Sequence, residues 1–138
     1  MKIIEEIGSD KGLQLFHEAV ERQAETIEKE IKKRIPKNLS TLDAGVEAYI
    51  VFMRDTGAEV QISKKGGDHA EFAVRRCPFY EALLDVDVRC NQLQGGVCMN
   101  LAIPAIESIL KRVDSRFKVE PKLIRKSSED ICLEEIRL

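Results

Sequence analysis

The feature that most constrains the fold is a change in the spacing of apolar residues near position 57. Before it, apolar side chains recur at intervals of three and four residues, and after it they alternate with polar ones. Intervals of three and four place side chains on one face of a helix, whereas alternation places them on one face of a strand. The chain therefore predicts helices in its first part and strands after them.

Two helices are predicted before this change. The first spans residues 9–35 and ends at Pro36, and the second begins at Ser40 or Thr41 and ends near Arg54. The apolar stripe of the first helix consists of Leu13, Phe16, Val20, Ala24, Ile27, Ile31 and Ile35. The expected buried face of the second consists of Val46, Tyr49, Ile50 and Met53. The apolar stripe is continuous, so it could supply a homodimer interface.

Two β-hairpins are predicted after the change. The first covers residues 58–76, with Gly66-Gly67 expected to provide the positive φ of a tight turn. Its alternating apolar residues are Ala58, Val60 and Ile62 on one strand and Ala70, Phe72 and Val74 on the other. A second hairpin closes the chain, and Pro121 confines its first strand to an edge or a bulge.

Further helices are predicted over residues 78–84 and 97–113, with a loop over 85–94 between them. Pro104 is expected to kink or break the longer helix. The resulting element order is ααββααββ. This order predicts a single α+β domain over residues 1–138, in which an antiparallel sheet of about four strands carries helices packed on one side.

The composition limits the partners and the compartment. The net charge of −2 gives no general attraction to nucleic acid or to anionic membranes. No apolar run approaches the roughly 18 residues of a membrane span. The N-terminal stretch MKIIEEIGSDKG has acids where a signal peptide has basic and apolar residues. We therefore expect a cytoplasmic protein with reduced thiols, without nucleic-acid or membrane partners.

The spacing of the four cysteines leaves three readings open. The pattern Cys77-x12-Cys90-x7-Cys98-x33-Cys132 contains no CxxC pair, the strong signature of zinc ribbons and ferredoxins. The cysteines can be small core residues, since free cysteine is among the most buried residue types. All four can instead converge as ligands of zinc or of an iron–sulfur cluster. The third reading is redox or nucleophilic use of one of them.

Cys98 is the predicted reactive thiol. It follows Gly95-Gly96 at the expected start of a helix, where free backbone N–H groups and the helix dipole lower the pKa of a thiol. The amides of Gly95 and Gly96 are also suited to binding an anion or a developing oxyanion.

Cys77 is the second candidate, at the point where a predicted strand leads into a helix. Arg76 precedes it and is suited to binding a substrate carboxylate, while Glu81, one turn later, is suited to acid–base work. Of the two histidines, His69 is expected on the exposed surface of a hairpin and His17 at the border of the apolar stripe.

A basic segment covers residues 111–126, with seven Lys or Arg and two acids. It lacks interleaved aromatic residues, which single-stranded nucleic acid binders use for stacking. We therefore interpret its charges as protection of a sheet edge against pairing with other chains.

The sequence Arg76-Cys77-Pro78, the later cysteines and the polar turn before Cys132 resemble the L-2-amino-thiazoline-4-carboxylic acid hydrolases over roughly residues 58–138. More distantly they resemble the 4-vinyl reductase domain, a small-molecule-binding and often metal-binding module. The resemblance implies a strand that ends at the Arg-Cys-Pro sequence, a helix, and a closing hairpin. Ser-Glu-Asp stands in the hairpin turn where those families typically carry Gly-Asp.

Two functions follow as expectations. The first is a small-molecule-binding domain with a cysteine-lined site, which hydrolyses a C–N bond in a small ring. There Cys98 or Cys77 would be the nucleophile or a metal ligand, the Gly95-Gly96 amides would stabilise the oxyanion, and Arg76 would hold a carboxylate. The second is a non-catalytic sensor that binds a metal, a cluster or a hydrophobic ligand.

Overall fold

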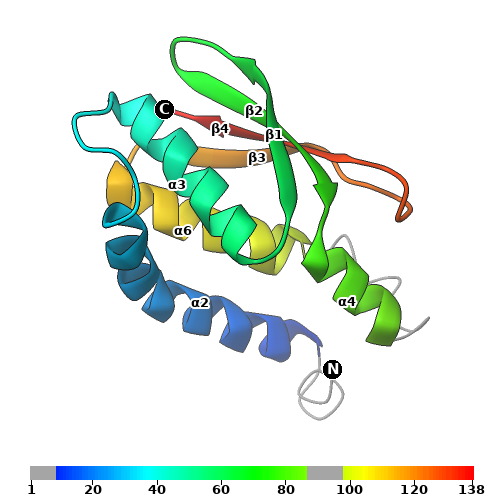
Figure 1. Ribbon diagram of the computed structural model, residues 1–138. Helices are drawn as coiled ribbons and strands as arrows, with labels where there is room; N and C mark the ends of the chain where they lie inside the picture. Colours follow the sequence, from blue (N-terminus) through cyan, green and yellow to red (C-terminus); the bar gives the residue numbers. More distant parts are fainter. Residues whose placement is uncertain (1–8, 87–97) are drawn as a thin grey trace.

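Helices cover one face of a four-stranded antiparallel sheet in the computed structural model, which describes residues 9–86 and 98–138 (Figure 1). The strands are β1 (Glu59–Lys65), β2 (His69–Arg76), β3 (Lys118–Leu123) and β4 (Cys132–Arg137), in the spatial order β1-β2-β4-β3. The helices are α2 (Ser9–Lys32), α3 (Thr41–Asp55), α4 (Pro78–Val86), the π-helical turn η2 (Cys98–Ala102) and α6 (Ile103–Val113). The predicted α+β class and the order ααββααββ are confirmed.

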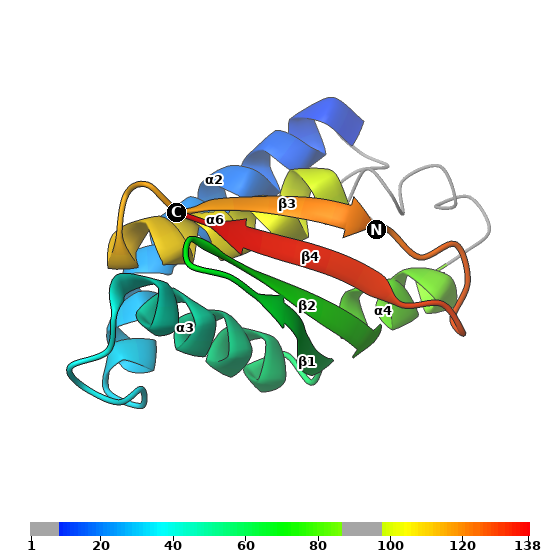
Figure 2. The same ribbon diagram turned by 90° about the horizontal axis from the view of Figure 1, so that it is seen from above.

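The helices form two levels beneath the sheet. Helices α3 and α6 lie against the strands, while α2 packs mainly on α6, farther from the sheet. Viewed from above, the strands lie over the helices, and α4 extends from the end of β2 (Figure 2). Strand β4 comes last in the sequence but lies in the interior of the sheet, between β2 and β3.

Local sequence signals set the ends of the first two helices. The Ser40 hydroxyl accepts a hydrogen bond from the backbone N–H of Asp43 at 3.2 Å, which caps α3 at the predicted position. Helix α2 ends at Lys32, three residues before the predicted residue 35. Residues 33–35 continue as a turn in which the N–H groups of Arg34 and Ile35 donate to the carbonyl of Ile31, and Pro36 disfavours helical backbone at Ile35. Ile35 still packs against the core.

The first hairpin forms as predicted, but its turn differs from the expectation. Gly57, which follows α3, has a φ of 92°, and no other glycine in the described ranges has a positive φ. The positive φ expected at Gly66-Gly67 is therefore wrong. The N–H of Gly66 donates to the carbonyl of His69 at 2.8 Å, which closes the turn around Gly67 and Asp68 without a positive φ at either glycine. Ile62, predicted to be buried, is 45% exposed next to a register shift on the edge strand β1.

The two internal prolines act as predicted. Pro104 lies in the first turn of α6, directly after η2, so the predicted helix over 97–113 is broken into two elements. Pro121 lies on the edge strand β3, beside a register shift in its pairing with β4. Both positions tolerate the missing backbone N–H of proline.

The core lies between the sheet and the helices α3 and α6. The Tyr49 ring of α3 stacks on Phe72 of β2, with ring centroids 4.0 Å apart. Ala70, Phe72 and Val74 are buried, which confirms the predicted inner face of β2. The ring of Phe117 is fully buried and packs so closely on α3 that only glycine fits at position 45.

This contact generates a prediction about stability. A Cβ at position 45 would lie 2.2 Å from Cζ of Phe117, so the buried ring must shift. We expect Gly45→Ala to lower the free energy of unfolding by about 2 kcal/mol in urea denaturation, because overpacking outweighs the gain in helix propensity.

The matched control is Gly67→Ala, because a Cβ there meets nothing within 4 Å. It should change stability by no more than about 0.5 kcal/mol. In a Phe117→Leu background, which frees space next to Gly45, the same Gly45→Ala change should cost clearly less. An equal cost in both backgrounds would contradict the proposed clash.

Candidate functional site

Cys77 lies where β2 leads into α4, as the sequence predicts. The backbone N–H groups of Phe79 and Tyr80, in the first turn of α4, act to lower the pKa of its thiol. The thiol therefore occupies the position of a helix N-cap. Burial nevertheless dominates, and it raises the pKa of Cys77 above the ordinary value for a thiol.

Cys132 lies on β4 directly opposite Val74 of β2, and its side chain is buried on the helix-facing side of the sheet. Arg125 holds its sulfur through two contacts. The Nε–H of Arg125 donates to Sγ of Cys132 at 3.3 Å, and the backbone N–H of Arg125 donates to the same atom at 3.5 Å.

Arg125 is itself buried, with 7% of its surface exposed. Its Nη2 donates to the carbonyls of Val74 at 2.7 Å and Arg75 at 2.9 Å. Its guanidinium also lies over the ring of Tyr80, 5.4 Å from the centroid, in a cation–π contact. The interpretation of the basic segment as edge protection is therefore wrong for Arg125. Its guanidinium ties together the end of β2, the start of α4 and β4.

Glu134 shares the helix-facing side of β4 with Cys132, because the two residues are separated by one position of the strand. Tyr49 of α3 donates its hydroxyl hydrogen to Oε2 of Glu134 at 2.6 Å. Burial raises the pKa of Glu134, and the bond from Tyr49 and the charge of Arg125 only partly oppose that rise. Glu134 is therefore a carboxyl that can take up a proton more readily than an exposed one.

Cys98 begins η2 and is half-buried. The pKa of its thiol is raised to about 11, mainly by burial and then by the charges of Cys77, Cys132 and Glu134, while Arg125 opposes the rise. The other four residues therefore act electrostatically on the Cys98 thiol, and we call Cys77, Cys98, Cys132, Arg125 and Glu134 the cysteine cluster. The lowered pKa expected for Cys98 is wrong, because desolvation dominates at this position.

The two charged residues predicted beside Cys77 pair with each other. Nε and Nη2 of Arg76 donate to the two carboxylate oxygens of Glu81 at 2.9 and 3.2 Å, on the exposed surface. This pairing lowers the pKa of Glu81, which makes it a weaker base than Glu134. Gly95, Gly96 and Cys90 lie outside the described residues.

The prediction of a metal site concerns the four cysteines. Within residues 9–86 and 98–138, no three His, Cys, Asp or Glu side chains are grouped so that they could hold a metal ion. Because Cys90 is outside those ranges, the set of four cysteine ligands for zinc or an iron–sulfur cluster stays a prediction. Because the fourth proposed ligand lies outside the described residues, we assign no metal to Cys77, Cys98 and Cys132.

Arg125, Glu134 and Tyr49 are the site residues that the sequence reasoning missed. For Glu134 a signal was present, since it alternates with Cys132 and Ile136 on the final strand, and this periodicity places all three on one face. For Arg125 no local signal separates it from the exposed basic residues around it.

The comparisons with known proteins add one finding. The family model described as L-2-amino-thiazoline-4-carboxylic acid hydrolase matches residues 1–126. The match includes both N-terminal helices and ends before β4, whereas the resemblance in the sequence was drawn over 58–138. No curated protein matches the chain significantly. The more distant resemblance to the 4-vinyl reductase domain stays a prediction. In the part of the chain that the structure describes, no helix is both long and apolar enough to cross a membrane.

The raised pKa of Cys98 predicts its reactivity toward alkylating reagents. Because the thiolate is the reactive form, alkylation of Cys98 by iodoacetamide should be slow near neutral pH. Its rate should rise about tenfold per pH unit up to about pH 10, whereas an ordinary thiol levels off near its own pKa of about 8.5. Peptide mapping by mass spectrometry measures this rate, and a plateau below about pH 9 would contradict the raised pKa.

The raised pKa of the half-buried Glu134 carboxyl predicts how stability depends on pH. Its pKa in the folded state is raised above 4.5, so the stability it contributes is present below that pH and is lost as pH rises through the folded value. Glu134→Gln should therefore gain stability relative to the wild type as pH rises above about 4.5 in urea denaturation.

Glu135→Gln is the matched control on the neighbouring position. Arg137 holds the pKa of Glu135 below its ordinary value, so that carboxylate stabilises the fold above the unfolded pKa and the effect is lost as pH falls. Its replacement should lose stability relative to the wild type at pH 8. The same sign of pH dependence in both variants would refute the assignment for Glu134.

Proposed function

Because the chain belongs to the L-2-amino-thiazoline-4-carboxylic acid hydrolase family, we propose that it hydrolyses a C–N bond in a small ring, at the cysteine cluster. One observation carries the proposal, namely that Cys98 is half-buried and that the charge of Glu134, itself a half-buried carboxyl, contributes to the raised pKa of this thiol. Nucleophilic catalysis by a thiol requires at least the thiol and a group that accepts its proton.

The proposed reaction assigns one role to each residue. Glu134 takes the proton of Cys98, and the sulfur attacks the ring carbon to form a C–S bond. The ring C–N bond then breaks, and the nitrogen leaves with the proton from Glu134. Water adds to the same carbon, the C–S bond breaks, and a proton returns to the sulfur. Arg125 supports the thiolate through its charge, which lowers the pKa of Cys98.

Glu134 suits this role better than the acid–base candidate expected from the sequence. Glu81 has 44% of its side chain exposed and is bound to Arg76, while Glu134 is half-buried and accepts a hydrogen bond from one neutral donor, the hydroxyl of Tyr49. A base with a raised pKa accepts a thiol proton with a smaller free-energy difference. In this proposal Arg76 binds a substrate carboxylate only if it first releases Glu81.

The alternative is a non-catalytic sensor, and one observation favours it. The pKa values of both Cys77 and Cys98 are raised, so both thiols are protonated at neutral pH when no substrate is bound. Such a site could bind a small molecule without turning it over. The two functions differ in whether 2-amino-thiazoline-4-carboxylate is consumed.

The test is to measure ring opening of 2-amino-thiazoline-4-carboxylate by chromatography for the wild type and for Cys98→Ser. We expect the substitution to lower kcat by about a hundredfold or more, because it removes the nucleophile. Met99→Leu is the control, since Met99 is the next residue of η2 and is 46% exposed. Full turnover by Cys98→Ser would exclude Cys98 as the nucleophile, and no turnover by the wild type would favour the sensor.

A further inference from the structure

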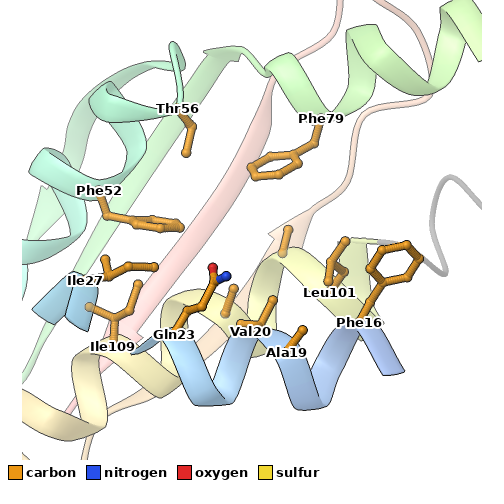
Figure 3. A pocket seen from close by; sticks show the side chains of 12 residues that line it. Phe16, Ala19, Val20, Gln23, Ile27, Phe52, Thr56, Phe79, Leu101 and Ile109 are labelled. Atoms are coloured by element: carbon orange, nitrogen blue, oxygen red, sulfur yellow. The ribbon is translucent and has the colours of Figure 1, made fainter. Parts of the chain in front are cut away.

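A cavity of about 390 Å³, open to solvent where Ala19 and Gln23 are exposed, lies among α2, α3, α4, η2 and α6. Figure 3 shows Phe52 of α3 and Phe79 of α4 on the side of the cavity opposite α2. Phe16 and Ala19 of α2 line the near side. The cavity thus has walls from several elements far apart in the sequence. None of its described lining residues belongs to the cysteine cluster.

The residues that line the cavity favour an uncharged and mostly apolar ligand. Among the described residues that line the cavity, none is charged, and three are phenylalanines. Two lining side chains are polar. Thr56 already donates its hydroxyl hydrogen to the carbonyl of Met53 at 2.6 Å, so its oxygen remains as an acceptor. The amide of Gln23 extends from α2 across the cavity and can both donate and accept (Figure 3).

We propose that this cavity binds a small neutral molecule, largely aromatic or aliphatic, with one polar group that pairs with Gln23. The volume lies in the range of small-molecule pockets, about 300–1,000 Å³, and an apolar lining with few polar groups is their usual composition. A charged ligand would lose its hydration without finding an opposite charge. A carboxylate such as the one in the family's named substrate therefore belongs elsewhere, and this is a second site beside the cysteine cluster.

The apolar stripe of α2 gains a specific role from this proposal. Phe16, Val20 and Ile27 line the cavity, while Ala24 and Ile31 are buried in the core. Much of the stripe thus faces its own chain. The homodimer through this helix stays a prediction, and a second copy is an alternative occupant that the experiment must separate from a small ligand.

The site also touches the turn that carries the reactive thiol. Leu101 and Ala102 line the cavity, and Cys98 begins the same turn, η2. A bound ligand that packs on Leu101 should restrict the motion of this turn. Occupancy should therefore slow the alkylation of Cys98 even though the ligand does not cover the sulfur.

The experiment uses N-phenyl-1-naphthylamine, a neutral aromatic probe with one N–H group that becomes fluorescent in apolar surroundings. We expect saturable binding of one probe per chain. Ala19→Trp places an indole in the cavity and should weaken binding by about tenfold or more. The matched control is Arg22→Trp, which introduces the same side chain at an exposed position of α2 that does not line the cavity, and it should bind like the wild type.

Three outcomes would overturn the proposal. The first is no saturable binding by the wild type, and the second is equal weakening by both tryptophan variants. The third is a dimer in sedimentation that the probe dissociates and that Ala19→Trp abolishes, since a second copy would then be the occupant. Binding needs no turnover, so Cys98→Ser should bind the probe normally. A loss of probe binding would therefore contradict the cavity proposal alone, and a loss of turnover would contradict the proposed hydrolase activity alone.

Discussion

The hydrogen bond from Tyr49 to Glu134 is the interaction on which the site depends. It joins α3 to the helix-facing side of the sheet at a half-buried position, where a carboxyl without a partner would be costly. Tyr49 also stacks on Phe72, so its hydroxyl is held in place by packing as well as by the hydrogen bond. The carboxyl therefore keeps a defined position beside the cysteines while its pKa stays raised.

Arg125 supplies the positive charge that this buried arrangement needs. Its guanidinium is held by two backbone carbonyls and by the Tyr80 ring, which leaves it little freedom to follow a ligand. Its effect is therefore a fixed field that lowers the pKa values of Glu134, Cys77 and Cys98 together. This fixed charge contrasts with Arg76, whose exposed pair with Glu81 can exchange partners. The uncharged cavity between the helices lies beside this charged site. It can therefore bind a different part of a ligand, or a different ligand.

The fold was predictable from the sequence because its signals are local. The capping of α3 at Ser40, the inner face of β2 and the break before Pro104 each follow from a few neighbouring residues. The prediction of a positive φ at Gly66-Gly67 was wrong, because two glycines permit a positive φ without requiring one.

The site was only partly predictable, because it depends on burial. Cys77 was placed correctly at the end of β2, since that needs only the order of elements. The pKa of Cys98 was predicted in the wrong direction, because its desolvation comes from other elements packed around it. Arg125 was missed because a cation inside a core is exceptional, and only its partners at residues 74, 75 and 132 explain it.

The position of β4 in the sheet has a consequence for how the protein assembles during synthesis. The strand that pairs with both β2 and β3 is the last of the four to leave the ribosome. Until residues 132–137 have emerged, β3 has no strand partner and Tyr49 has no carboxyl to bind. The hairpin of β1 and β2 can form early because its contacts are local, whereas closure of the sheet joins distant segments and is the slower step. The nascent chain must therefore shield two incomplete sheet edges during this interval, and the buried site forms only when β4 pairs with both of them.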